Sequence, residues 1–158
     1  MNTTLPPTHV DQVRQATIST FEAICGVAPE SHWKMPEGAS RQAMVGIISI
    51  VSDVMWTIML GFPEEMATAL AIKFAGFDVP FDSPDMGDVV GEIANILAGD
   101  VTCRLDVVGL KTEMSLPTIA RGTDVDVLLP AGVTSTRMWF TLPEGAFWLD
   151  LALGRYHC

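Results

Sequence analysis

Glu92 and Asn95 are the residues of this chain whose types and spacing best suit chemistry. They stand three positions apart, so on an α-helix their side chains are neighbours on one surface. The carboxamide of Asn95 both donates and accepts hydrogen bonds, which suits it to holding a water molecule. Polar residues at this spacing are also common on an ordinary solvated helix face. The pair alone therefore leaves two interpretations open, a reactive site and a solvated surface.

The pair lies in Ser83–Asp100, which the sequence predicts to be one helix. Ser83 can cap the N-terminus, and Pro84 suits the first helical position, where its missing N–H has no partner to lose. Gly99 is placed to end the helix in a left-handed conformation. At 3.6 residues per turn, one arc should face a core and carries Val89, Val90, Ile93, Ile96 and Leu97. The opposite arc carries Asp88, Glu92 and Asn95, with Gly91 and Gly99 beside them.

Gly91 is unusual on such a face, because a glycine inside a helix costs about 1 kcal/mol relative to alanine. One reason to keep it is that another backbone or molecule approaches closely there. Asp88, Gly91 and Gly99 are therefore candidate contacts for a partner, beside the candidate catalytic residues Glu92 and Asn95.

The segment GEIANILAG resembles the E-x-x-N helix of the chemotaxis phosphatases of the CheC, CheX and FliY group, and most closely that of CheX. The segment Met44–Gly76, read as a hairpin followed by a helix, and SLPTIARG at Ser115–Gly122 are also similar to that family. One such motif occurs here, as in CheX, whereas CheC-like chains carry two. The chain departs from the family at Asp100, where Asn is frequent, and at Ser52-Asp53, where the first hairpin usually turns through Gly.

The resemblance implies a phosphatase that removes phosphate from the aspartate of a CheY-like response regulator. Asn95 would enter the partner's active site and orient the attacking water, and Glu92 would contact a lysine of the partner. Small neighbours such as Gly91 and Gly99 would let the helix come close. The magnesium ion would belong to the regulator, so this chain is expected to bind no cofactor and no metal. The resemblance also implies a homodimer.

Two other function classes remain as alternatives. A noncatalytic adaptor that binds a response regulator, or a module of a signalling assembly, could keep the same helix. A conventional hydrolase has less support, because the chain has no G-x-S-x-G, H-E-x-x-H or P-loop motif. Its histidines, His9, His32 and His157, have no neighbouring nucleophile in the sequence.

Composition narrows the partners. The 158 residues suit a single domain covering 1–158, and the net charge of -10 argues against nucleic acid and anionic membranes. The three cysteines, without a C-x-x-C motif, indicate free thiols in a reducing cytoplasm rather than a zinc site or a disulfide framework. No signal peptide is evident at the start of the sequence. Ala43–Phe62 is apolar enough to suggest a membrane span, but Ser52-Asp53 in its middle favours two buried strands.

These patterns predict an α+β fold, with helices packed on an antiparallel sheet and the polar face of the Ser83–Asp100 helix outward. The other predicted helices are Thr8–Cys25 and a segment that Pro63 opens and Gly76 ends. The predicted strands are a short one near Ser31–Met35, then Ala43–Val51, Val54–Phe62, Val101–Val108, Asp124–Leu129, Thr134–Leu142 and Ala146–Leu153. Gly109–Gly122 is predicted to be a connection. Arg137–Leu142 or Ala146–Leu153 could form a sheet edge that a second copy covers.

Overall fold

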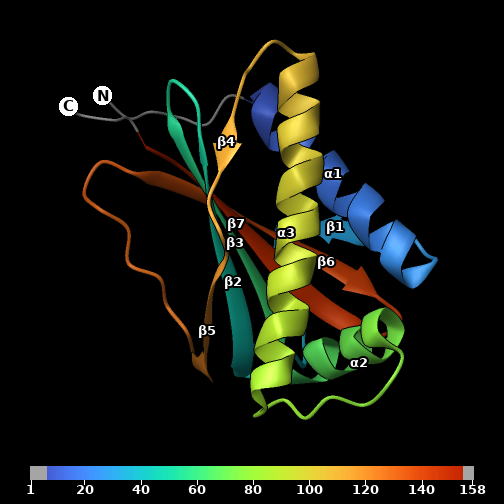
Figure 1. Cartoon of the computed structure of the whole chain (residues 1–158). Helices are drawn as coiled ribbons and strands as arrows, with labels where there is room; N and C mark the ends of the chain where they lie inside the picture. Colours follow the sequence, from blue (N-terminus) through green and yellow to red (C-terminus); the bar gives the residue numbers. More distant parts are fainter. Residues whose placement is uncertain (1–6, 155–158) are drawn as a thin grey trace.

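A computed structural model describes residues 7–154, so His157 and Cys158 lie outside the described residues. The elements follow in the order α1 (Pro7–Cys25), β1 (Glu30–His32), β2 (Gln42–Val51), β3 (Met55–Pro63), α2 (Glu64–Ala75), α3 (Pro84–Val107), β4 (Glu113–Met114), β5 (Thr118–Thr123), β6 (Thr134–Leu142) and β7 (Gly145–Gly154). The strands pair antiparallel in the order β1-β6-β7-β3-β2-β4, and β5 also pairs with β2. The three helices lie against one face of this sheet (Figure 1), which confirms the predicted α+β class.

The main core lies between the sheet and the helices. Alternate residues of the long strands point toward the helices, as the two-residue period of a strand requires. Their aromatic side chains form one stack, in which Phe147 lies 4.2 Å from Phe21 of α1 and 5.1 Å from Phe140 of β6 between ring centroids. Full burial of each such side chain contributes about 1.5–3 kcal/mol, so this layer fixes the helices on the sheet.

The apolar segment Ala43–Phe62 is the β2–β3 hairpin, as predicted, with residue pairs from Ala43↔Pro63 to Val51↔Met55. The turn closes where Ser52 donates its backbone N–H to the carbonyl oxygen of Val54 at 2.9 Å. The hairpin is buried on both faces because the helices cover one face and the segment 124–133 covers the other. No helix within residues 7–154 has the length and apolar character needed to cross a membrane.

The flanking helices also follow the sequence signals. α1 ends before Gly26 (φ 78°) and α2 before Gly76 (φ 84°), both in the left-handed conformation that glycine favours. α1 begins at Pro7, so Thr8 lies in its first turn rather than capping it. The short strand β1, at Glu30–His32, begins one residue earlier and ends three residues earlier than the predicted Ser31–Met35.

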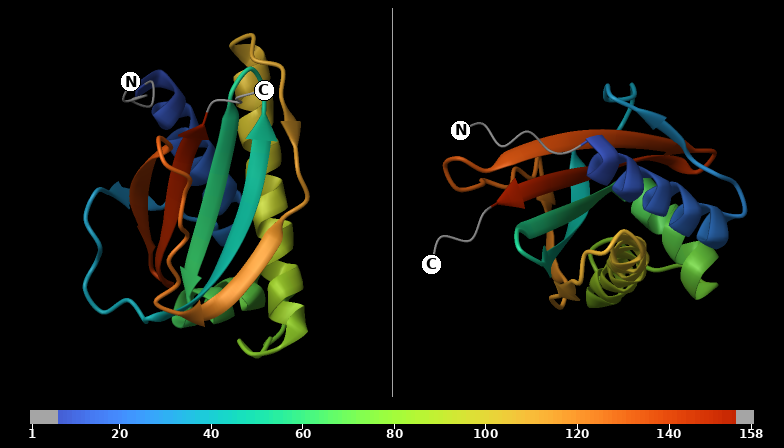
Figure 2. Two further views of the ribbon diagram at one scale, coloured as in Figure 1. Left: turned by 90° about the vertical axis from the view of Figure 1, so that its left-hand side faces the viewer. Right: turned by 90° about the horizontal axis from the view of Figure 1, so that it is seen from above.

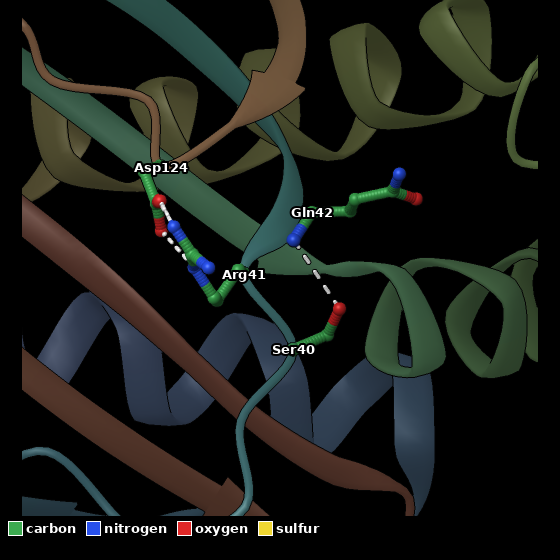
Figure 3. Close-up of polar contacts among 4 residues, drawn as sticks. All are labelled: Ser40, Arg41, Gln42 and Asp124. Atoms are coloured by element: carbon green, nitrogen blue, oxygen red, sulfur yellow. Dashed lines mark hydrogen bonds and ion pairs between the residues drawn. The ribbon is translucent and has the colours of Figure 1, made fainter.

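The segment 124–133 is an irregular covering over the back face of the sheet, so the predicted strand Asp124–Leu129 is wrong. Val125, Val127 and Leu129 are half-buried against that face, which explains their alternation without a strand ladder. Arg41 holds the start of the segment. Its guanidinium donates to both carboxylate oxygens of Asp124 (Figure 3). Asp124 in turn donates its backbone N–H to the carbonyl of Arg41 at 2.9 Å.

The sheet edges differ from the prediction as well. The predicted connection Gly109–Gly122 contains β4 and most of β5. Both strands pair with β2 and form the edge of the sheet on the β2 side. β7 lies inside the sheet between β6 and β3, so Ala146–Leu153 cannot be an edge. β4 and β5 lie along one side of α3 in the views of Figures 1 and 2, and this places them beside the candidate site.

Candidate functional site

The helix that carries Glu92 and Asn95 is longer than predicted. Ser83 caps it by accepting a hydrogen bond from the backbone N–H of Met86, as the sequence indicated. The helix then passes through Gly99 and ends at Val107, so the predicted end at Gly99 and the predicted strand Val101–Val108 are both wrong. Val101 and Leu105 are buried and continue the apolar stripe at helical spacing, which keeps the chain helical beyond the glycine.

The inner face of α3 packs on the sheet. Val90, Ile93 and Leu97 are buried there, as predicted, whereas Ile96 is 41% exposed and does not face the core. Ile96 stands one turn after Glu92 and flanks the polar pair on the outside of the helix.

The outer face of α3 forms one wall of a hollow of about 380 Å³. Asp88 and Glu92 are exposed there, and Asn95 is half-buried. The residues that line the hollow are Gly87, Asp88, Gly91, Glu92, Asn95, Leu116, Pro117 and Ile119. The structure therefore brings together Asp88, Gly91, Glu92 and Asn95 and sets Gly99 further along the same helix.

Gly91 is buried, and its close neighbours belong to this chain. A Cβ atom at Gly91 would lie 3.6 Å from Cδ1 of Ile119 and 3.7 Å from Cγ of Pro117, which is ordinary contact. The close approach inferred from the sequence is thus the approach of the segment before and into β5. A contact of Gly91 with a partner stays a prediction.

The second wall of the hollow was missed from the sequence. Leu116, Pro117 and Ile119 form it, and Leu116 is 87% exposed. Ser115 ties this wall to β2, because its N–H donates to the carbonyl of Ser49 at 2.8 Å and its Oγ accepts from the N–H of Ser49 at 3.0 Å. The sequence signal for this wall is the SLPTIARG segment, which resembles the family but does not by itself reveal where the segment lies in the fold.

The outward side of α3 is acidic. Its exposed carboxylates are those of Asp85, Asp88, Glu92 and Asp106. The single arginine of the helix, Arg104, lies on another side, 3.5 Å from the carboxylate of Asp100. Glu92 forms no ion pair with residues 7–154, so its charge is available to an external cation.

Asp100 also faces away from the hollow. Its carboxylate accepts a hydrogen bond from Thr20 of α1 at 3.3 Å and pairs with Arg104, which places it in the contact between α1 and α3. The departure from the family at Asp100 therefore lies in the contact between α1 and α3 and not in the hollow beside Glu92 and Asn95. No cluster of three or more His, Cys, Asp or Glu residues suited to a metal occurs within residues 7–154.

A family model described as chemotaxis phosphatase CheX matches residues 44–141, which is more than half of the chain and includes Glu92 and Asn95. The chain belongs to the CheX family. This confirms the resemblance drawn from the E-x-x-N helix. Comparison with curated protein sequences found no match.

Solved structures share the fold at low sequence identity. CheX from Vibrio vulnificus superposes with a TM-score of 0.78 at 17% identity, covering 92% of this chain and 99% of that one. CheX from Desulfovibrio desulfuricans gives 0.79 at 18% identity, with 92% and 99% covered. The CheX–CheY–BeF3–Mg2+ complex from Borrelia burgdorferi gives 0.71 at 18% identity, with 94% and 98% covered.

Proposed function

We propose that this chain is a phosphatase that hydrolyses the aspartyl phosphate of a CheY-like response regulator. The observation that carries the proposal is the position of Glu92 and Asn95, which stand together on the outward face of α3 beside an open hollow. Membership of the CheX family supports the reaction, and the Borrelia complex of CheX with CheY supports this class of partner.

The chemistry asks little of the helper protein, because an acyl phosphate is already reactive. Hydrolysis needs a water molecule in line with the phosphorus and the leaving oxygen, and compensation for charge on the phosphoryl oxygens. The Asn95 carboxamide orients the water, accepting one of its hydrogen bonds. Glu92 pairs with a lysine of the regulator and fixes the docking. Charge compensation comes from the magnesium ion that the regulator itself holds.

Half-burial of Asn95 suits this role. Leu116, Pro117 and Ile119 line the same hollow as Asn95, and in this proposal they restrict the directions in which its side chain can point. A positioned amide holds a water more effectively than a freely rotating one, because less freedom is lost at the moment of reaction.

We also propose that the protein acts as a homodimer in the cytoplasm. β1 pairs only with Trp139, Phe140 and Thr141 of β6, so the outer edge of residues 134–138 has no partner strand within the described residues. An open edge of this kind is commonly covered by another chain. Light scattering coupled to gel filtration measures the state directly, and a monomer at micromolar concentration would contradict it.

The test compares Asn95→Ala with the wild type in phosphate release from a panel of phosphorylated regulators of the same organism. We expect one regulator to lose phosphate faster with the wild type, and the Asn95→Ala rate enhancement to fall by about 100-fold or more, as for loss of a positioning group. Gln15→Ala is the matched control, because it removes an exposed amide from α1, away from the hollow. An Asn95→Ala protein with normal turnover would refute the mechanism, and binding without turnover by the wild type would support the adaptor instead.

A further inference from the structure

A second and larger hollow, of about 660 Å³, lies further along the same side of α3. It is lined by Val51, Thr102, Cys103, Asp106, Lys111, Thr112 and Glu113. Both hollows have α3 on one side and the segment 111–119 on the other, and that segment runs beside the helix in Figures 1 and 2. The two hollows are therefore successive parts of one groove.

The helix places one continuous stripe along this groove. Steps of four and three residues keep side chains on one face, and they connect Asp88, Glu92, Asn95, Gly99, Thr102 and Asp106. The stripe continues past the predicted end of the helix only because α3 runs on to Val107. The additional two turns carry three of the seven residues that line the second hollow.

Gly99 stands between the two hollows. A Cβ atom added there would meet nothing within 4 Å, in contrast to Gly91 and Gly46, where this chain's own side chains lie close. A helical glycine costs about 1 kcal/mol relative to alanine, and no described contact of this chain requires one here. The space at Gly99 is open to an external surface.

We propose that the response regulator docks along the whole groove, crossing α3 at Gly99 and placing a lysine or arginine in the second hollow beside Asp106 and Glu113. This inference rests on the proposed phosphatase function and adds a specificity-determining surface to it. The charges fit, because the second hollow carries two carboxylates against one lysine, Lys111, and the outward side of α3 carries further carboxylates and no cation. Docking there is continuous with the face that carries Glu92 and Asn95.

Contacts of the regulator with the second hollow lie far along α3 from Asn95, so they should affect binding and leave the chemical step unchanged. Interactions made equally in the bound and reacting states lower KM without raising kcat. The second hollow would therefore select among regulators with similar active sites, according to whether a basic side chain reaches it.

The first experiment introduces side chains into the groove. The probe is the beryllofluoride-loaded, magnesium-bound form of the regulator that the phosphatase panel identifies, or of any regulator that binds if none is turned over. We expect Gly99→Gln to weaken its binding by at least about tenfold, as for obstruction near the centre of an interface, and to raise KM with kcat retained. The Gly99→Gln chain itself should unfold at the same or a higher denaturant concentration, because a Cβ atom at this position meets nothing within 4 Å and glutamine is a better helix former than glycine. Ala23→Gln, at an exposed position of α1, is the matched control.

The second experiment tests the charge. Asp106→Lys should weaken binding of the same probe by at least about tenfold, with an effect that shrinks as salt is raised. Glu22→Lys on α1 changes the net charge equally and lies away from the groove, so it should bind as the wild type does.

Alkylation gives a readout within the wild-type chain. Cys103 is exposed and lines the second hollow, so bound regulator should slow its reaction with iodoacetamide. Cys25 is buried, and burial together with the nearby Glu144 carboxylate raises the pKa of its thiol, so it should react slowly with or without regulator. Mass spectrometry of the separated peptides follows each cysteine individually.

The outcomes separate this inference from the proposed function. Wild-type binding by Gly99→Gln and Asp106→Lys, with Cys103 unprotected, overturns the extended docking surface while Asn95→Ala can still establish the phosphatase. Normal turnover by Asn95→Ala overturns the mechanism, and the binding series then still decides where the partner docks. If no regulator binds the wild type, both proposals are wrong.

Discussion

Two glycines of the hairpin sit at neighbouring positions of the sheet and face opposite sides. Gly46 of β2 faces α3, where an added Cβ would lie 3.0 Å from Cβ of Ala94. Gly61 of β3 faces the back, where its cross-strand partner Trp148 folds its ring over the glycine and an added Cβ would lie 2.0 Å from Cε2. Replacing each by alanine therefore adds one methyl group to one of the two layers.

The two substitutions should separate stability from activity. At Gly61 the methyl group would occupy the position of the Trp148 ring, so the ring must leave its site, and we expect Gly61→Ala to cost about 3–5 kcal/mol, as for loss of a buried aromatic side chain. At Gly46 the contact is short by a few tenths of an ångström, and we expect Gly46→Ala to cost about 1–3 kcal/mol, as for overpacking. Ala94 immediately precedes Asn95, so relief of the Gly46 contact displaces the helix turn that carries the candidate catalytic pair.

Urea unfolding gives the free energy of each variant, and phosphate release is then measured at a temperature where each is folded. We expect Gly61→Ala to be the less stable protein but to keep wild-type turnover per folded molecule, and Gly46→Ala to be the more stable of the two but to lose turnover. Because domains of this size are stable by only about 5–15 kcal/mol, both effects are well within measurement. If Gly46→Ala keeps full turnover, or Gly61→Ala costs less than Gly46→Ala, the close packing that positions α3 is not as described.

Two further predictions concern the segments that frame the site. Arg41 holds the pKa of the Asp124 carboxyl below its usual range through their hydrogen bonds, so the pair's stabilising effect is present above the unfolded pKa and is lost as pH falls through the lowered folded pKa. The difference in unfolding free energy between the wild type and Asp124→Asn, measured by urea unfolding, should therefore shrink below about pH 4. A difference that grows there would contradict this prediction. Ser83→Ala removes the cap of α3 and should cost about 1 kcal/mol, whereas Ser83→Asp, which keeps an acceptor oxygen, should cost less; equal losses in the two variants would show that the cap is not the cause.

Local signals account for the parts of the fold that the sequence predicts well. Ser83 and Pro84 begin α3 where expected, and Gly26 and Gly76 end α1 and α2 in left-handed conformations. These signals depend on a few adjacent residues and so can be read from sequence. The prediction that the helix ends at Gly99 is wrong because glycine ends a helix only where the chain turns away. Here the apolar side chains continue at helical spacing through Val101, and their burial favours a longer helix.

The strand errors have a different cause. Val125, Val127 and Leu129 alternate with exposed residues as a strand would, yet they bury against the back face without pairing. Conversely, β5 has weak alternation of its own and is a strand because β2 offers it an edge. Which segment reaches that edge is decided by long-range packing, and composition over six residues carries little information about it.

The contrast between local signals and long-range packing applies to the candidate site as well. Glu92 and Asn95 could be located from one helix, because residues three apart on a helix share a face wherever the helix is placed. The wall of Leu116, Pro117 and Ile119 comes from a segment whose position only the fold reveals. Small residues set the distances between these parts. Gly91 lets Pro117 and Ile119 of the wall pack close to α3, and Gly46 lets α3 pack close to the sheet. Gly99 differs from both, because a Cβ atom added there would meet nothing within 4 Å, so the packing of this chain gives no reason for a glycine at this position.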